Sequence, residues 1–448
     1  MKKKNIYFIS IALFLATATF ILLRHQAKAK NRATKVYYLL ERNGVTAEME
    51  EWKEVRAKAN KLLTKIQDNP DDVASLIALA SVYITEARIS GNYMYYDRAA
   101  MKCVNDVLKK NQNDFEALSL KAMVLLSEHH FAEAITAAKK AVEINPYNAF
   151  VYGTLVDGYV EMGDYKAAVE NLEKMMSIRP DMRSYARVSY LREIHGDYPG
   201  SIEAMKLAVD AGAQSDEATA WTRVQLGQLY EKTGDAKMAK LNYLLVLDER
   251  PGYAYALSSL ARLAVIEKKY DRAIQLYLQA DSSIRDYSIR EELSQAYFLK
   301  GDERKANEVM QSIVQKMSQD MAKEILGDSV GHYSDLQLAS AHLKLKDYDK
   351  ALKHAYTEYN RRPENIDVNE TLAWVYYLKG EFLKALPHIR SALRTNSKNP
   401  VLLCRAGLIL SKAGESFAAK ALLLQVLAGN AHLSDDLKSE GLKILQTL

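Results

Sequence analysis

Nine histidines and a few serine-containing loops are the residues of this 448-residue chain that could supply metal-binding or nucleophilic chemistry. The histidines show no H-E-x-x-H motif or other spacing expected of zinc ligands. His129 and His130 fall in a predicted turn between helices, where we expect both to be exposed to solvent. Gly327-Asp328-Ser329 superficially resembles a hydrolase serine motif, but no predicted strand precedes it. Since no phosphate-binding loop occurs either, the sequence predicts no catalytic residue, no metal and no cofactor.

The two cysteines and the distribution of charge narrow the function further. Cys103 and Cys404 lie at apolar helical positions near opposite ends of the chain, so we expect two buried thiols and no disulfide. The formal net charge is +5, but residues 1–35 carry eight basic residues and no acidic one. The remainder has 53 basic and 56 acidic residues, a net charge of −3. We therefore expect no nucleic acid partner.

The segment 152–180 has the pattern of an antiparallel helix pair. Apolar or small residues recur at spacings of three and four on either side of Met162-Gly163-Asp164-Tyr165. Glycine is favoured where a helix ends and aspartate where the next begins. Pro180 marks the end of the second helix, because proline disfavours helical geometry in the residue before it. A small residue, Ala168, is expected where the two helices cross.

The small residue early in the second helix recurs along the chain, mostly in steps of 33 or 34 residues. A glycine, or Lys268 in its place, stands five residues before most of these positions, and a proline follows several of them. The segment Leu226-Gly227…Tyr230…Ala239…Tyr243…Val246…Pro251 resembles the tetratricopeptide repeat almost position for position. The recurring small residues are Ala134, Ala168, Ser201, Ala239, Ala273, Ala306, Ala351, Ala385 and Ala419.

This resemblance, which covers roughly residues 71–430, implies an all-α fold: a right-handed superhelical α-solenoid of about ten antiparallel helix pairs. Two units are irregular. Sixteen residues separate Tyr83 from Ala99, against nine in a regular unit, so both helices there are expected to be longer, with Ser90-Gly91-Asn92 at the tip. The 45 residues between Ala306 and Ala351 predict a helix that continues through 321–326, followed by a loop at 327–331.

In tetratricopeptide proteins the first helix of each pair lines a concave groove, so the resemblance also implies a binding surface. Aromatic side chains, arginine and glutamine at the groove positions suit an extended peptide, whose backbone needs hydrogen bonds and whose side chains need pockets. The same aromatic residues could instead pack between repeats, and both interpretations stay open. The groove candidates are Arg183, Tyr190, Trp221, Gln228, Tyr255, Arg262, Gln295, Trp374 and Tyr377.

The N-terminus has the features of a membrane-targeting segment. Three lysines precede residues 6–23, which contain no charged residue. That length favours a retained anchor, whereas Ala27-Lys28-Ala29 offers a signal-peptide cleavage site. Basic residues follow the segment as well, so its orientation in the membrane is open. The predicted organisation is a signal peptide or signal-anchor helix at 1–30, a tether and capping helix at 31–70, the solenoid at 71–430 and a capping helix at 431–448.

Together these features predict a non-catalytic scaffold that binds protein or peptide partners in its concave groove. The hydrophobic N-terminus indicates a place in a bacterial cell envelope, where the protein is membrane-anchored, periplasmic or secreted. The alternative is a substrate-recruiting subunit of an envelope enzyme, such as a glycan-modifying or secretion complex. A scaffold anchored with the opposite topology, facing the cytoplasm, is a third possibility.

Overall fold

The computed structural model describes residues 14, 15, 17, 19, 36–325, 331–429 and 433–448. The chain divides into two units, Met1–Leu40 and Glu41–Leu448, and the paired helices belong to the second. The predicted anchor lies outside the described residues, apart from the four single positions near its middle, as does most of the predicted loop at 327–331.

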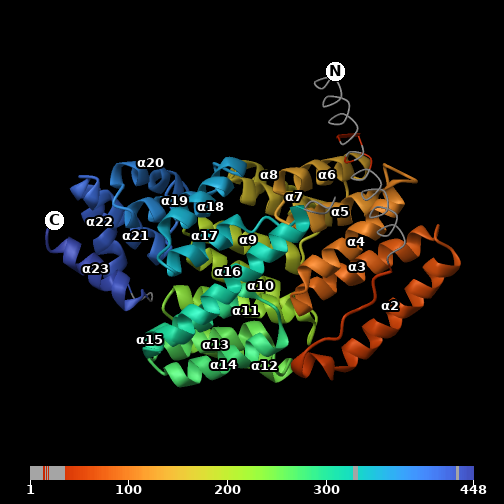
Figure 1. Ribbon diagram of the computed structural model, residues 1–448, viewed down its shortest axis with the longest axis horizontal. Helices are drawn as coiled ribbons and strands as arrows, with labels where there is room; N and C mark the ends of the chain where they lie inside the picture. The colour runs from red at the N-terminus through yellow and green to blue at the C-terminus, as the bar shows by residue number, and fades with distance from the viewer. Residues whose placement is uncertain (1–13, 16, 18, 20–35, 326–330, 430–432) are drawn as a thin grey trace, which may run out of the picture. The chain divides into compact units, whose positions relative to one another are not determined.

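The second unit is built from helices that follow one another as antiparallel pairs (Figure 1). Its described part contains a short 3₁₀ helix, η1 (Gly44–Ala47), and 22 α-helices, with no strand. The first helices of the ten pairs are α3 (Val73–Ser90), α5 (Phe115–Ser127), α7 (Ala149–Met162), α9 (Met182–Ile194), α11 (Glu217–Lys232), α13 (Ala254–Ile266), α15 (Tyr287–Lys300), α17 (Asp335–Lys344), α19 (Ile366–Leu378) and α21 (Pro400–Lys412). The second helices are α4 (Tyr93–Leu108), α6 (Phe131–Ile144), α8 (Tyr165–Ile178), α10 (Tyr198–Asp210), α12 (Ala236–Glu249), α14 (Tyr270–Ser283), α16 (Glu303–Ile325), α18 (Tyr348–Arg361), α20 (Phe382–Ala392) and α22 (Ser416–Leu427).

The turn inside each pair is set by a residue with left-handed backbone geometry. Gly163 ends α7 at φ +81°, and Asp164 then caps α8 by accepting a hydrogen bond from the amide of Ala167. Lys268, predicted to stand in for glycine, has φ +59°. A non-glycine side chain is strained there, so the repeat tolerates a local cost to keep the turn.

The small residues that recur with the repeat lie at the helix crossings, as predicted. Eight of the nine are fully buried, and Ala306 is 5% exposed. At the one serine, Ser201, the crossing is polar: the hydroxyl of Ser189 on α9 donates to the Ser201 carbonyl at 2.8 Å. The hydrogen bond offsets the cost of burying a hydroxyl between two helices.

The two irregular units also agree with the sequence-based expectations where they are described. The pair α3–α4 is longer than its neighbours and turns at Gly91, which has φ +70°. Tyr96 is buried and stacks on Tyr83 with the ring centroids 6.0 Å apart, so this aromatic residue packs within the pair. Helix α16 continues to Ile325. Both cysteines are buried free thiols.

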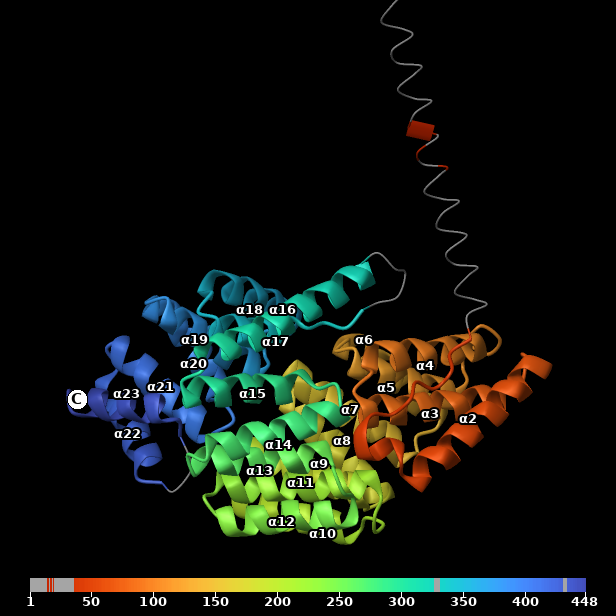
Figure 2. The same ribbon diagram turned by 60° about the horizontal axis from the view of Figure 1, so that its bottom comes forward.

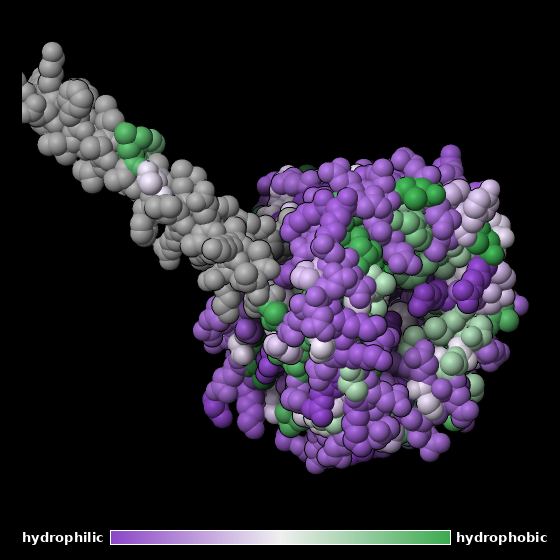
Figure 3. Space-filling model, turned by 90° about the vertical axis from the view of Figure 1, so that its right-hand side faces the viewer, coloured by the Kyte–Doolittle hydropathy of each residue, from purple (hydrophilic) through white to green (hydrophobic). Residues whose placement is uncertain are grey.

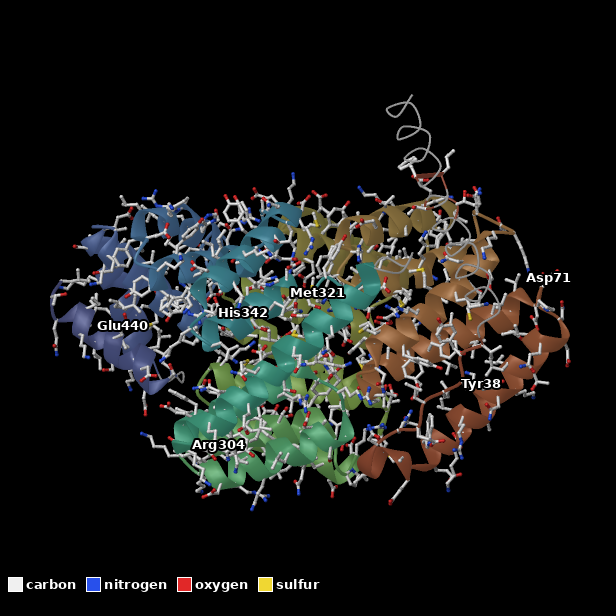
Figure 4. All side chains as sticks on the ribbon, viewed as in Figure 1. Tyr38, Asp71, Arg304, Met321, His342 and Glu440 are labelled. Atoms are coloured by element: carbon white, nitrogen blue, oxygen red, sulfur yellow. The ribbon has the colours of Figure 1, made fainter. Side chains whose placement is uncertain are left out.

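Single helices lie at each end of the ten pairs. Helix α2 (Glu50–Asp68) precedes them, and its Trp52 side chain is buried, with 2% of the residue exposed. Helix α23 (Asp435–Leu445) follows them and carries Glu440, labelled in Figure 4. The face seen in Figure 3 is largely hydrophilic, with apolar residues in scattered groups. The apolar side chains are therefore used mainly between helices, in successive clusters along the array.

A feature that the sequence did not reveal is a set of contacts between repeats about 200 positions apart. The amide of Arg285 donates to the carbonyl of Ser90 at 3.1 Å. The amide of Tyr333 donates to the carbonyl of Glu128, also at 3.1 Å. In each case the turn of one pair meets the connection that leads into the pair six repeats later. At about 34 residues per repeat, six repeats are about 204 residues, so one superhelical turn contacts the next. We call this row of contacts the inter-turn seam.

The inter-turn seam overturns the expectation that His129 and His130 are exposed. His130 is 1% exposed, and the ring nitrogens of both residues bond to backbone carbonyls at 331–333. The prediction was wrong because an isolated helix pair does expose this turn. Only the partner from the following superhelical turn covers it.

By length and composition, α3 is the one helix in the described part of the chain that could cross a membrane. Half of that helix is buried, including Leu76, Leu79 and Tyr83, and it packs against α4 and α5. Its apolar residues therefore belong to the core of the first repeat.

Candidate functional site

The first helices of three successive pairs, α11, α13 and α15, line a pocket of about 360 Å³. Four of the nine predicted groove residues lie in it: Trp221 and Gln228 on α11, and Tyr255 and Arg262 on α13. A pocket of this size is at the lower end of the range for ligand sites in proteins. The remaining lining residues are Gln225, Glu231, Lys232, Ser258, Ser288, Ile289 and Glu292.

Arg262 is held in place by residues of the two neighbouring helices. Its Nε donates to Glu231 on α11 at 3.2 Å, and its Nη1 donates to Glu292 on α15 at 3.3 Å. Burial alone would lower the pKa of Arg262, but the charges of Glu292 and Glu231 outweigh that effect and raise it. Burial in turn raises the pKa of Glu292, against the opposing charge of Arg262. The network fixes a charged group on the pocket wall and links three repeats.

The two aromatic residues of the pocket differ in how firmly they are held. The hydroxyl of Tyr255 donates to Asp286 at 3.2 Å, and the ring packs edge-on against Tyr253 with the centroids 5.7 Å apart. Trp221 is 36% exposed, which is unusual for an indole in a helical array. Tyr255 thus forms part of the rigid wall, whereas Trp221 presents apolar surface to the pocket.

Arg183 and Tyr190 lie on α9, the first helix of the pair before α11, and do not line this pocket. Tyr190 is 41% exposed, yet loss of hydration, with the charges of Asp367 and Glu161, raises its pKa well above the ordinary value. The guanidinium of Arg183 lies 5.2 Å from the centre of the Phe150 ring. Arg183 therefore contacts α7 and does not contribute to the pocket.

The other three predicted groove residues are placed differently. Gln295 is exposed on α15 but does not line the pocket. Trp374 and Tyr377 stack on one another with the centroids 4.9 Å apart. Tyr377 is 7% exposed and donates its hydroxyl to Glu440 of α23 at 2.6 Å. For Tyr377 the structure therefore supports the alternative interpretation, in which the aromatic residue packs against a neighbouring helix.

Part of the pocket was not predicted from the sequence, because several of its residues lie at helix ends. Glu231 and Lys232 lie at the end of α11, and Ser288 and Ile289 lie at the start of α15, away from the central groove positions. The end of α11 and the start of α15 therefore line the same pocket. Within the described residues no group of three His, Cys, Asp or Glu side chains could hold a metal ion.

Comparison with known proteins gives one family similarity. Residues 26–242, slightly less than half of the chain, match the family described as ChAPs (Chs5p-Arf1p-binding proteins). No curated protein matches the chain.

Many solved structures resemble the chain weakly. A tetratricopeptide repeat protein from Parabacteroides merdae is 15% identical with a TM-score of 0.43, covering 55% of this chain and 93% of that one. Human IFIT1, solved as a dimer with m7Gppp-AAAA, is 14% identical with a TM-score of 0.42, covering 78% and 88%. YrrB, described as a TPR protein with an unusual peptide-binding site, is 17% identical with a TM-score of 0.29, covering 46% and 97%. Similarity at this level does not extend to function.

The periodic small residues at every helix crossing, the left-handed turn residues and the ten antiparallel pairs are the defining features of one repeat architecture. The chain is a tetratricopeptide-like repeat protein that forms an α-solenoid.

Proposed function

We propose that this protein is a non-catalytic scaffold that binds an extended peptide segment of a partner protein at the pocket of α11, α13 and α15. The observation that carries the proposal is the convergence of Trp221, Gln228, Tyr255 and Arg262 on that pocket. Similarity over residues 26–242 to a family named for binding other proteins supports a protein partner.

The lining of the pocket suits a peptide in three respects. The exposed face of Trp221 offers apolar contact for one side chain of the partner. The amides of Gln225 and Gln228 each carry donors and an acceptor, which match the groups of an extended backbone. Arg262 and Glu292 present both signs of charge, so the pocket has no strong preference for a highly charged ligand.

Selection from a displayed library of unstructured 12-residue peptides, with the purified full chain as bait, tests the proposal. We expect selected peptides to bind the wild type and to lose at least tenfold in affinity for Trp221→Ala. Tyr147→Ala is the matched control, because Tyr147 is an 82% exposed aromatic residue in the connection between α6 and α7. Equal affinity for all three proteins would contradict the proposal. If a single-stranded RNA bound the wild type and competed with the peptides, the ligand of the pocket would be a nucleic acid and the peptide proposal would be wrong.

We further propose that the hydrophobic N-terminal segment tethers the scaffold at a bacterial cell envelope. The uncharged residues 6–23 and the three lysines before them support a membrane-targeting segment. Basic residues also follow the segment, so the orientation of the protein in the membrane stays open. Protease added to intact cells should digest the helical array if it faces outward, after permeabilisation of the outer membrane where there is one. An array that is protected in intact cells and recovered with the membrane fraction would favour the cytoplasmic topology.

The rival function is recruitment of a substrate to an envelope enzyme. It differs in one observable: a peptide selected on the pocket would then compete with the substrate of an enzyme that co-purifies with the chain. The purified chain alone is expected to turn over no substrate under either function.

A further inference from the structure

Three histidines lie together where two superhelical turns meet. His129 and His130 form the turn between α5 and α6, and His332 lies in the connection that leads into α17. The rings of His129 and His332 have their centroids 4.2 Å apart. The ring of His130 packs on Tyr333 at 3.9 Å. This part of the inter-turn seam is therefore built from imidazole rings, the side chains whose charge changes most readily near neutral pH.

Each imidazole forms a hydrogen bond to a backbone carbonyl across the seam. His129 donates from Nδ1 to Tyr333 at 2.8 Å, His130 from Nε2 to Gly331 at 2.6 Å, and His332 from Nδ1 to Ser127 at 3.0 Å. A carbonyl accepts but cannot donate, so each of these nitrogens carries its proton. One bound proton is enough for every bond, and the neutral ring already satisfies the contact.

A second proton on these rings would bring positive charge into a region that already contains cations. Arg362 lies over the Phe131 ring at 4.8 Å, and Phe131 stacks on His129. Arg361 lies over the Tyr333 ring at 3.8 Å. Arg361 ends α18 and Arg362 follows it, so both cations reach the seam from the later superhelical turn.

The carboxylates around the seam are largely engaged by other partners. Glu358 pairs with Arg361 and Arg362, and Asp335 pairs with Arg361 and His354. Glu133 is the exception, since it lies 3.9 Å from the His130 ring and is 60% exposed. Glu128, at the end of the α5 turn, is buried and accepts the amide of Tyr333 through its carbonyl. The surroundings thus favour neutral His129 and His332.

The pKa values follow the same physical causes. Loss of hydration, with the nearby Arg362, lowers the pKa of His129 to about 4. Loss of hydration, with the neighbouring His129, lowers the pKa of His332 to about 3, although the hydrogen bond to Ser127 and the charge of Glu358 oppose the shift. In an open seam both rings would be hydrated, and each pKa would return to about 6.5. Because the closed form binds protons less tightly than the open form, closure is favoured above pH 6.5 and weakened as the pH falls below it.

We propose that His129 and His332 make this part of the inter-turn seam a proton-sensitive contact, closed when both rings are neutral and opened when they are protonated. The device goes beyond the proposed peptide function and does not depend on it. Between about pH 6.5 and about pH 4, each histidine should shift the equilibrium toward the open form about tenfold per pH unit. From pH 7.5 to pH 5.0 a single histidine therefore contributes about 30-fold.

Hydrogen exchange of the full chain tests the proposal at one amide. The amide of Tyr333 donates across the seam to Glu128, whereas that of Ala273 donates within its own helix pair, to Lys269. After correction for intrinsic exchange, protection at Tyr333 should fall at least 30-fold between pH 7.5 and pH 5.0, and protection at Ala273 should hold. An equal fall at both amides would show global unfolding and overturn the proposal, as would constant protection at Tyr333.

Variants separate protonation from other effects of acid. In His129→Asn/His332→Asn the amide nitrogen can replace the Nδ1 donor but cannot be charged near neutral pH. This variant should keep the protection of Tyr333 and lose its pH dependence. His388→Asn is the control, since His388 lies on α20 outside the seam, and it should behave as the wild type. Should the double variant fail to fold, the single variant His332→Asn should reduce the pH response at least fivefold. A pH response equal to that of the wild type, in the double variant or in His332→Asn, would contradict the proposal.

Discussion

The hydroxyl of Tyr165 accepts a hydrogen bond from the backbone amide of Ile366 at 3.2 Å, across 201 positions of sequence. Tyr165 begins the second helix of one repeat, and Ile366 begins the first helix of the repeat six places later. In Figure 1 the segments α7–α8 and α18–α19 lie close together, in agreement with this contact, and Figure 2 shows the same helices turned by 60°. The seam therefore adds long-range contacts to a fold whose stability is usually described by neighbouring repeats alone.

Replacing Gly163 by alanine should test the packing of the seam. The new Cβ would overlap the carbonyl of Glu364, and φ is +81°. Gly301→Ala is a matched control: its φ is +91°, but nothing lies within 4 Å. Both variants should lose about 1 kcal/mol to left-handed strain. Gly163→Ala should lose at least about 1 kcal/mol more by overpacking, measured by denaturant unfolding. Equal losses would mean that the seam is not closed in solution.

Replacing Arg362 by methionine should expose the cost of an unpaired buried charge. Arg362 is 4% exposed and pairs with Glu358 on its own helix segment and with Glu161 on α7. Breaking a buried pair typically costs about 3–5 kcal/mol. Glu161 loses its guanidinium partner in this variant, whereas Glu358 keeps Arg361, so we expect the lower end of that range, about 3 kcal/mol. Arg304→Met removes an exposed pair with Glu308 on α16 (Arg304 is labelled in Figure 4) and should cost less than about 1 kcal/mol. Thermal unfolding of the two variants compares them; similar midpoints would argue against a buried pair.

Replacing Ala168 by leucine tests the repeat register. Ala168 is fully buried where α7 crosses α8, so the larger side chain should cost roughly 1–3 kcal/mol. Lys166→Leu adds a leucine to the same helix at a side chain that is 89% exposed, and its effect should be within about 0.5 kcal/mol. Urea unfolding distinguishes the two. An unchanged midpoint for Ala168→Leu would place the helix crossing elsewhere.

The sequence and the structure agree where a residue's environment is set by its own repeat. The buried position of Ala168, the left-handed Lys268 and the long α3–α4 pair all depend on contacts within about 35 residues, which periodicity encodes. His129 and His130 were placed wrongly because their cover comes from residues more than 200 positions later. That contact depends on the accumulated rotation of six repeats. The pattern of residues within one repeat does not determine this accumulated rotation closely enough to predict the contact.

In the candidate pocket, too, positions set by the repeat itself could be predicted, whereas contacts with a distant helix could not. The first-helix positions Trp221, Gln228, Tyr255 and Arg262 were predictable from the groove face of the repeat. Tyr377 occupies the equivalent face, but the capping helix α23 covers it and Glu440 accepts its hydroxyl. An open groove position therefore requires that no later helix packs over it, and the repeat pattern does not specify where such a helix lies.

Asp97 should make stability fall as the pH rises. This carboxyl group on α4 is 2% exposed, and burial raises its pKa to about 7, although the hydroxyl of Ser127 donates to it at 2.7 Å. The folded state thus holds a proton that the unfolded chain releases near pH 3.8. The group's contribution is present below that pH and is lost as the pH rises to about 7. The difference in stability between Asp97→Asn and the wild type should grow by about 2–3 kcal/mol between pH 5 and pH 7. Urea unfolding at both values checks this, and a constant difference would contradict it.

Site-specific photocrosslinking of a selected, biotinylated peptide tests the peptide-binding pocket most directly. A benzoylphenylalanine is placed either at Gln228, in the pocket, or at Gln275, an exposed residue of α14 outside it. We expect the peptide to crosslink at position 228, unlabelled peptide to compete with it, and position 275 to give only background. Equal crosslinking at both positions, or none at 228 under conditions where the peptide binds, would show that the pocket of α11, α13 and α15 is not the binding site.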